Sequence, residues 1–219
     1  MASASVTEYE MTTEENPQKY FETGAVAATG ICKFVFVDLL PYKFWYILTA
    51  ILFWTGYIVW RLKKDPRILH HWGFRVDTFR TSFLMLLPFA LVALTAFAVY
   101  GWVNETLIFN WHIIPTLLLY PLWGTVQQLL IVGLIAGNLT DMKGPRWWII
   151  PVTASIFAVV HYPSLLLVAG TFVLALVYTP VYLRHRNIWT LGLYHGWLAC
   201  FFYFFVLGRD PWREVFVTL

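Results

Sequence analysis

The sequence predicts an all-α protein that crosses a membrane several times. Of its 219 residues, 59% are hydrophobic and 12% are charged, against about 25% charged in a typical soluble domain. The mean hydropathy is +0.64, and a chain this apolar exposes surface that lipid covers better than water. The apolar residues form long runs, and we expect these runs to be helices because lipid cannot satisfy exposed backbone polar groups.

Six apolar runs approach or exceed the length of about 20 residues that spans a bilayer as a helix. They are Phe44–Trp60, Thr81–Trp102, Ile113–Leu139, Trp147–Tyr162, Leu165–Leu183 and Ile188–Leu207. A shorter run, Val26–Leu40, is interrupted by Lys33 and Asp38, so we expect an interfacial helix or a seventh span there. The chain then divides into a polar acidic N-terminal tail, N-terminal helices with a basic loop, a helical core and a C-terminal tail (1–23, 24–80, 81–207 and 208–219).

Basic residues concentrate on one side of the predicted spans. Ten of the fifteen Lys and Arg residues lie in the loops 61–80, 140–146 and 184–187, which the positive-inside rule assigns to the cytoplasm. Six spans leave both termini outside, and a seventh span at Val26–Leu40 moves the N-terminus inside. We expect the basic loops to meet anionic lipid headgroups. A net charge of +3 is too small to indicate nucleic-acid binding.

Four polar side chains lie inside apolar runs, where polar groups are energetically expensive. Gln127 and Gln128 are adjacent in the third run, and the fourth and sixth runs carry His161 and His195. Polar groups at membrane depth usually face a bundle interior or a cavity, so we expect these four to share one buried site. The third run contains no Asp, Glu, Lys or Arg, so the glutamines bring no charge to that site.

The order of these residues resembles that in the CAAX protease and bacteriocin-processing family of intramembrane glutamic peptidases. That family has a Glu-Glu-x-x-x-Arg-Gly helix, then Phe-x-x-x-His, then His-x-x-x-Asn. Gly133, Phe157, His161 and His195 match this pattern. The similarity covers the segment Thr81–Leu207, and it implies the helical fold of that family.

Four other positions depart from the family pattern. Gln127 and Gln128 stand where the family has its two glutamates. Val132 stands where it has arginine, and Ala199 where it has asparagine. The resemblance implies a mechanism in which a glutamate activates water while histidines position the water and stabilise the oxyanion. A glutamine amide cannot accept a proton near neutral pH, so it cannot replace that general base.

The losses at this site are physically coherent. Positions 128 and 132 are one helical turn apart, so the family's glutamate and arginine share a helix face. Loss of the glutamates alone would leave a buried arginine without a partner, which is strongly destabilising. Both signs of charge are absent here, which is typical of a site that has become neutral as a unit.

The sequence therefore favours a non-catalytic member of this family, an assembly or stabilising subunit of a membrane complex. The former active-site cavity could hold a lipid, an isoprenoid chain or a pigment. A divergent intramembrane peptidase or hydrolase is the first alternative, and a transporter or channel subunit is the second. We expect the partners to be the lipid bilayer and other membrane subunits, with the acidic tail 1–23 and the aromatic run Phe201–Phe205 as candidate docking surfaces.

Simpler interpretations of the four polar residues remain open. A glutamine pair can bond neighbouring helices, at about 0.6 kcal/mol per contact, and a buried histidine can be purely structural. His161 and His195 could also be metal or haem ligands. Zinc requires three or four good protein ligands, and glutamine is a poor one. We therefore expect no metal and no cofactor.

Overall fold

The structure, a computed structural model, describes residues 15–216, and every regular element in that range is helical. Residues 1–14 of the expected tail and residues 217–219 lie outside this range. The elements are α1 (Glu15–Lys33), η1 (Phe34–Leu39), α2 (Lys43–Lys64), α3 (Ile68–Trp72), α4 (Phe79–Val103), α5 (Ile113–Gln128), η2 (Leu129–Gly137), α6 (Asn138–Asp141), α7 (Arg146–Val159), α8 (Leu165–His185), α9 (Ile188–Phe201), η3 (Phe202–Val206) and α10 (Pro211–Phe216). The η segments are π-helical continuations of the helices that precede them.

Six helical segments within the described residues are long and apolar enough to cross a membrane, which confirms the predicted all-α, multi-pass class. They are Pro17–Leu39, Phe44–Lys64, Phe79–Val103, Ile113–Asp141, Leu165–His185 and Ile188–Val206. Four of the six predicted spans agree with the structure to within a few residues at each end. The first predicted span, Phe44–Trp60, also forms, and extends to Lys64 as the long helix α2.

Two predicted segments differ from the structure. Val26–Leu40 belongs to a 23-residue helical segment that starts at Pro17, so residues 17–23 are helical rather than part of a tail. The predicted span Trp147–Tyr162 contains only the 14-residue helix α7, which is shorter than the roughly 20 residues of a full span. Helix α7 ends at Val159, four residues before Pro163. A proline disfavours the helical conformation of the residue that precedes it, so the helix stops short of this position.

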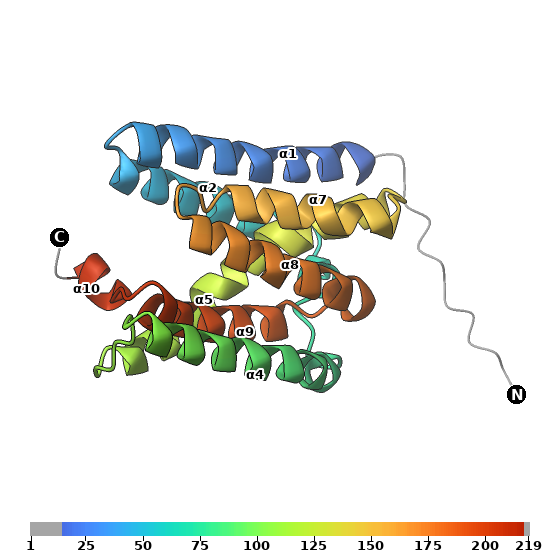
Figure 1. Cartoon of the computed structure of the whole chain (residues 1–219). Helices are drawn as coiled ribbons and strands as arrows, with labels where there is room; N and C mark the ends of the chain where they lie inside the picture. The colour runs from blue at the N-terminus through green and yellow to red at the C-terminus, as the bar shows by residue number, and fades with distance from the viewer. Residues whose placement is uncertain (1–14, 217–219) are drawn as a thin grey trace, which may run out of the picture.

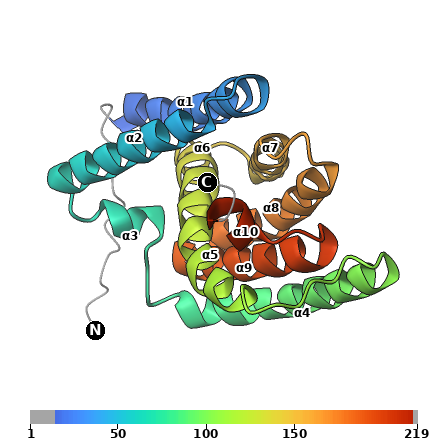
Figure 2. The same ribbon diagram turned by 90° about the vertical axis from the view of Figure 1, so that its left-hand side faces the viewer.

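The helices form a bundle in which α1, α7, α8, α9 and α4 run side by side (Figure 1). The continuous helix made by α5, η2 and α6 crosses them steeply, from the level of α4 and α9 up to α1 (Figure 2). Its middle section η2 lies at the centre of the core, since all of its residues except Leu130 are buried. This crossing helix carries both glutamines into the interior.

Helices α5 and α9 approach closely because glycines line their contact. A Cβ added to Gly124 of α5 would lie 2.6 Å from the Gly192 carbonyl oxygen and 2.9 Å from the Gly196 nitrogen. A Cβ at Gly196 would collide with the backbone of Tyr120 and Pro121. Small residues spaced one turn apart let membrane helices pack backbone against backbone. The close contact places the C-terminal end of α5 directly beside the middle of α9.

A charged network ties the N-terminal helices to the core at the end of the bundle that carries the basic loops. The Glu22 carboxylate is 1% exposed and accepts hydrogen bonds from Tyr57 Oη (2.6 Å) and Asn138 Nδ2 (2.7 Å). Its Oε1 also lies 3.3 Å from Arg61 Nε. Nearby, Asp141 accepts a 2.6 Å hydrogen bond from Arg186 Nη2. The first turns of α1 are therefore docked on α2 and α6.

The aromatic run Phe201–Phe205 packs within the chain. Phe204 is 0% exposed and Phe205 is 8% exposed. The ring centroids of Phe202 and Phe97 are 5.2 Å apart, and those of Phe205 and Phe109 are 5.1 Å apart. The run therefore fills the contact between α9, α4 and the loop before α5, and it is not the open docking surface expected from its sequence.

Candidate functional site

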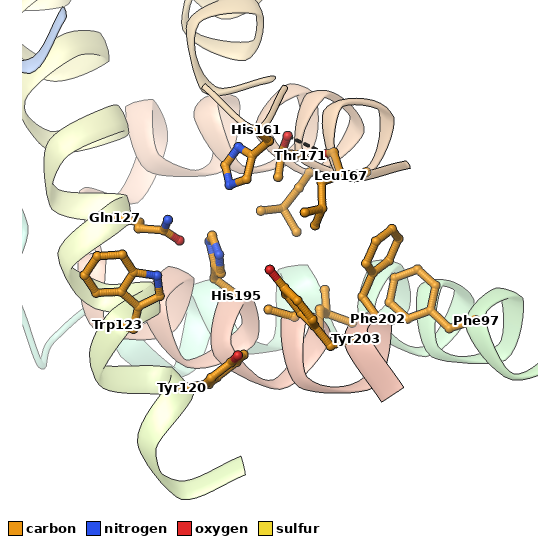
Figure 3. A pocket seen from close by; sticks show the side chains of 14 residues that line it. Phe97, Tyr120, Trp123, Gln127, His161, Leu167, Thr171, His195, Phe202 and Tyr203 are labelled. Atoms are coloured by element: carbon orange, nitrogen blue, oxygen red, sulfur yellow. Dashed lines mark hydrogen bonds between the residues drawn. The ribbon is translucent and has the colours of Figure 1, made fainter. Parts of the chain in front are cut away.

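A cavity of about 130 Å³ lies between α4, α5, α8 and the α9–η3 helix. Three of the four predicted polar residues, Gln127, His161 and His195, line it, and their side chains point toward one another from three segments of the chain (Figure 3). The remaining lining residues are Phe97, Tyr120, Trp123, Leu167, Gly170, Thr171, Leu174, Leu198, Ala199, Phe202 and Tyr203. Three polar side chains from segments far apart in the sequence thus lie together at one end of a mostly apolar cavity.

His161 lies just after the end of α7, and its hydrogen bond fixes which ring nitrogen carries the proton. Its Nδ1 is 2.7 Å from the carbonyl oxygen of Phe157, one helical turn earlier. A carbonyl oxygen can only accept, so Nδ1 is the donor and carries the proton. In the neutral ring, Nε2 is then an acceptor, and it is the nitrogen left to face the cavity.

His195 has the opposite arrangement. Its Nδ1 is 2.7 Å from the amide nitrogen Nε2 of Gln128. An amide nitrogen can only donate, so Nδ1 is the acceptor and the neutral ring carries its proton on Nε2. Gln128 is 1% exposed and His195 is 7% exposed, so this contact is shielded from solvent and lipid. Gln127 lines the cavity, whereas Gln128 supports His195 from behind.

Phe157 packs against both histidines. Its ring centroid lies 5.0 Å from that of His161 and 5.6 Å from that of His195. Phe157 is 1% exposed and does not line the cavity, so it supports the two rings from the protein interior. Its backbone carbonyl also holds His161, and one residue thereby fixes the position of both rings.

The positions that depart from the family pattern lie in different surroundings. Ala199 lines the cavity, one turn after His195 on α9. Val132 is 0% exposed within η2 and does not line the cavity. Gly133 packs beside Leu129 and Ile188 on the side toward Trp72. An arginine at position 132 would therefore be fully buried. Only an oppositely charged partner could compensate the free-energy cost of burying its charge.

None of the residues that line the cavity is an Asp, Glu, Lys or Arg. The charged groups near it are paired elsewhere. Lys33 Nζ donates to the Tyr162 carbonyl oxygen (2.8 Å) and to Asp38 (2.6 Å). Arg209 lies 5.9 Å from the centroid of the Tyr203 ring and donates to Glu214 at 2.6 Å. The interior of the cavity is polar but uncharged while its histidines are neutral.

Within residues 15–216, no three His, Cys, Asp or Glu side chains lie close enough together to hold a metal ion. His161 and His195 would supply two nitrogen ligands, and the flanking glutamine amides are weak ones. The donor set therefore fits hydrogen bonding better than metal coordination.

Several lining residues escaped the sequence analysis. Tyr120 and Trp123 precede Gln127 by seven and four positions, so all three lie on one face of α5. On the continuous helix formed by α9 and η3, His195, Ala199 and Phe202 share a face in the same way. The helical periodicity around each polar residue would have identified these neighbours, whereas the contribution of α8 depends on tertiary packing.

Comparison with known families confirms the predicted resemblance. The family model described as "Type II CAAX prenyl endopeptidase Rce1-like" matches residues 87–201, just over half of the chain, and the match contains all four predicted polar residues. No curated protein and no solved structure shows significant similarity to the chain. The matched segment lies within the predicted core Thr81–Leu207 and includes α5, α8 and α9, which contribute most of the residues that line the cavity. The chain therefore belongs to the Rce1-like family of type II CAAX prenyl endopeptidases.

Proposed function

We propose that this chain is a non-catalytic member of the family, an integral membrane subunit that acts by binding. The observation that carries the proposal is the hydrogen bond between Gln128 Nε2 and His195 Nδ1 (2.7 Å) in a cavity without a carboxylate. Peptide hydrolysis needs a group that takes a proton from water in the transition state. The amide of Gln128 cannot take one, and its contact places the His195 proton on the ring nitrogen that faces the cavity.

His161 is the remaining candidate base, because its Nε2 carries a lone pair. Catalytic histidines are usually oriented by a carboxylate, which also stabilises the imidazolium that forms. The Nδ1 of His161 instead donates to the Phe157 carbonyl oxygen, an uncharged acceptor. A protonated His161 would therefore have no counter-ion among the cavity residues, and this arrangement supports binding rather than hydrolysis.

A cleavage assay tests the proposal. The purified protein in lipid nanodiscs would be incubated with a panel of prenylated CAAX peptides and unmodified membrane peptides, and products would be measured by mass spectrometry. We expect no product above the level of the His161→Ala variant. Turnover that the His161→Ala substitution abolishes would contradict the proposal.

The alternative is a divergent peptidase, and one observation favours it. The two family histidines share one cavity, and the ring of Phe157 lies within 5.6 Å of each histidine ring. A hydrolase could use such a pair with a substrate group as the base. The same cleavage assay separates the two functions, because only the peptidase gives turnover that depends on His161.

The subunit role is supported by the surface of α2. Among its described side chains, only Trp54 and Tyr57 are buried. A groove of about 580 Å³ runs between α1 and α2, with small residues such as Ala25 and Ala28 on one wall and aromatic residues on the other. Small residues favour close helix packing in membranes. We propose that a transmembrane helix of a partner subunit packs along α2 at this groove.

Photo-crosslinking tests this docking surface. A photoreactive amino acid at Phe53 on α2, which lines the groove and is 44% exposed, is compared in native membranes with one at Leu118 on α5, which is 72% exposed. We expect a discrete protein adduct at Phe53 and only lipid adducts at Leu118. Lipid adducts alone at both positions would contradict the subunit role.

We infer the orientation from the basic loops. The loops 61–80, 140–146 and 184–187 gather at the end of the bundle where α1 begins. Arg61 pairs there with Glu22 of α1 (3.3 Å), and Asp141 contacts both Lys19 of α1 (3.9 Å) and Arg186 (2.6 Å). We propose that this end faces the cytoplasm, together with the start of α1. Labelling of a cysteine at Lys64 or at Asn104 with an impermeant thiol reagent would distinguish the two orientations.

A further inference from the structure

The two cavity histidines offer complementary hydrogen-bonding groups. Nε2 of His161 is an acceptor, and Nε2 of His195 is a donor, because each Nδ1 is already engaged within the chain. Neither Nε2 has a hydrogen-bond partner among residues 15–216. A hydroxyl group donates one hydrogen bond and accepts others. One hydroxyl placed between the rings would therefore satisfy both histidines.

The absence of charge among the lining residues restricts the ligand further. Burying a phosphate, a carboxylate or an ammonium group without a counter-ion is costly in a medium of low polarity. Lys33 and Arg209 lie outside the lining and are paired with Asp38 and Glu214. Gln127 adds one amide, which can donate to and accept from an uncharged group. The polar end of the cavity therefore selects a neutral head group.

The rest of the cavity is apolar. Phe97, Leu167, Leu198 and Phe202 line it, and in Figure 3 Phe97 and Phe202 lie on the side away from Gln127. Phe97 and Phe202 are half-buried, so this side borders the surface that faces lipid. A hydrocarbon chain attached to the neutral head group would extend past these rings into the bilayer.

The size of the cavity suits a small head group. Its volume of about 130 Å³ is several times the roughly 10–15 Å³ of probe-occupied space that one water molecule needs. A hydroxyl group and the first carbons of its chain therefore have room in it.

We propose that the cavity binds an uncharged lipid alcohol, a single-chain amphiphile whose hydroxyl lies between His161 and His195. This inference rests on the proposed function, since it assigns a ligand to a site that binds without cleaving. The hydroxyl donates to His161 Nε2 and accepts from His195 Nε2, and Gln127 lies within the same polar end. The aromatic rings of Phe97 and Phe202 guide the chain outward.

Photoaffinity labelling in nanodiscs tests the ligand class. The probes are a long-chain alcohol with a diazirine in its chain, the fatty acid of the same chain and the matching primary amine. After illumination, labelled peptides are identified by mass spectrometry. We expect the alcohol to label peptides of α8 and α9 about tenfold more strongly than the acid or the amine, because the charged forms of these two probes find no counter-ion among the lining residues.

Substitutions connect the labelling to the cavity. Gln127→Leu changes a half-buried residue without removing a hydrogen bond from the core, and His161→Phe keeps an aromatic ring while removing the acceptor. We expect each to reduce labelling by the alcohol several-fold, with Leu118→Ala on the outer face of α5 as the unchanged control. Equal labelling by all three probes, or alcohol labelling that neither substitution reduces, would overturn the proposal.

The cleavage assay on the same preparation separates this inference from the proposed function. Selective labelling by the alcohol together with His161-dependent turnover would refute the non-catalytic role and leave the ligand class standing. Loss of selective labelling without turnover would refute the ligand class alone.

Discussion

Two buried polar regions of this protein stabilise their groups in opposite ways. In the charged network, Glu22 has three partners, Tyr57 and Arg61 on α2 and Asn138 on α6. Beside the cavity, Gln128 has one hydrogen-bonding partner, His195, and neither group carries a charge while the histidine is neutral. The comparison shows that the buried carboxylate of Glu22 is stabilised by partners on two neighbouring helices. The neutral side chains of Gln128 and His195 need only the one hydrogen bond between them.

The two regions also differ in their relation to the family. All of the residues that line the cavity except Phe202 and Tyr203 lie within the matched residues 87–201, whereas Glu22, Tyr57 and Arg61 lie outside them. The charged network thus joins α1 and α2 to the family core through Asn138. It serves the assembly of the bundle, while the neutral cavity serves the proposed binding function.

Removal of Glu22 should have the largest effect. Glu22→Ala leaves the guanidinium of Arg61, whose side chain is 16% exposed, without its carboxylate partner, and loss of one partner of a largely buried ion pair costs up to about 3–5 kcal/mol. We expect a corresponding loss of stability in thermal unfolding of the protein in nanodiscs. The control is Glu214→Gln, which breaks an exposed pair with Arg209 and should cost about 0–1 kcal/mol. Equal effects of the two substitutions would show that burial does not distinguish them.

Gly196→Ala should have the next largest effect, through the cavity. The added Cβ meets the backbone of Pro121, so α5 and α9 must separate, and overpacking of this kind costs about 1–3 kcal/mol. Separation should also weaken the contact of Gln128 with His195. Gly56→Ala in α2 is the matched control, since no heavy atom lies within 4 Å of its added Cβ. It should leave stability unchanged or raise it.

Gln128→Leu should destabilise the protein less than Glu22→Ala. It leaves Nδ1 of His195 buried without a partner, which costs about 1–3 kcal/mol. Gln127→Leu should cost less, because Gln127 is half-buried and makes no hydrogen bond within the described residues. Chemical denaturation of the two variants under the same conditions compares them. A larger loss for Gln127→Leu would mean that the two glutamines have exchanged roles.

A smaller polar cluster at the opposite end of the bundle should respond to acid. Burial opposes the charged form of Asp210, but hydrogen bonds from His112 (2.6 Å) and Asn110 (2.8 Å) hold the pKa of its carboxyl below the ordinary value. A carboxyl whose pKa is lowered by folding stabilises the folded state at pH values above its unfolded pKa of about 4. This stabilisation is lost as the pH falls through the folded-state pKa. Proteolysis of the C-terminal segment should therefore increase below that pH in the parent protein and depend less on pH in Asp210→Asn.

The sequence predicted the membrane class and the shared site because both depend on local pattern. Gln127, Gln128, His161 and His195 are conspicuous as polar residues in apolar runs, and the family spacing relates them to one another. The cavity face of α5 follows from helical periodicity. Which glutamine faces the cavity and which supports His195 depends on how closely α5 approaches α9, and that distance is set by glycines on both helices.

The first membrane helix could not be predicted at its full length. Its first turns contain Lys19 and Glu22, and a hydropathy argument counts such residues against a span. Their partners, Asn138 and Asp141, lie more than one hundred positions later in the sequence. Only the folded chain shows that the charges are paired. The early end of α7, in contrast, has a local cause, Pro163. A search for apolar runs does not detect it, because the residues around the proline are themselves mostly apolar.

The protonation of the two histidines tests most directly whether the site is a neutral binding pair. Selective ¹⁵N labelling of histidine, with His161→Phe and His195→Phe variants for assignment, allows NMR to identify the protonated nitrogen of each ring. We expect neutral rings at neutral pH, with the proton on Nδ1 of His161 and on Nε2 of His195, and a shift of the His195 proton to Nδ1 in Gln128→Glu. A cationic ring at neutral pH, or the same protonated nitrogen in both histidines of the parent protein, would contradict the account.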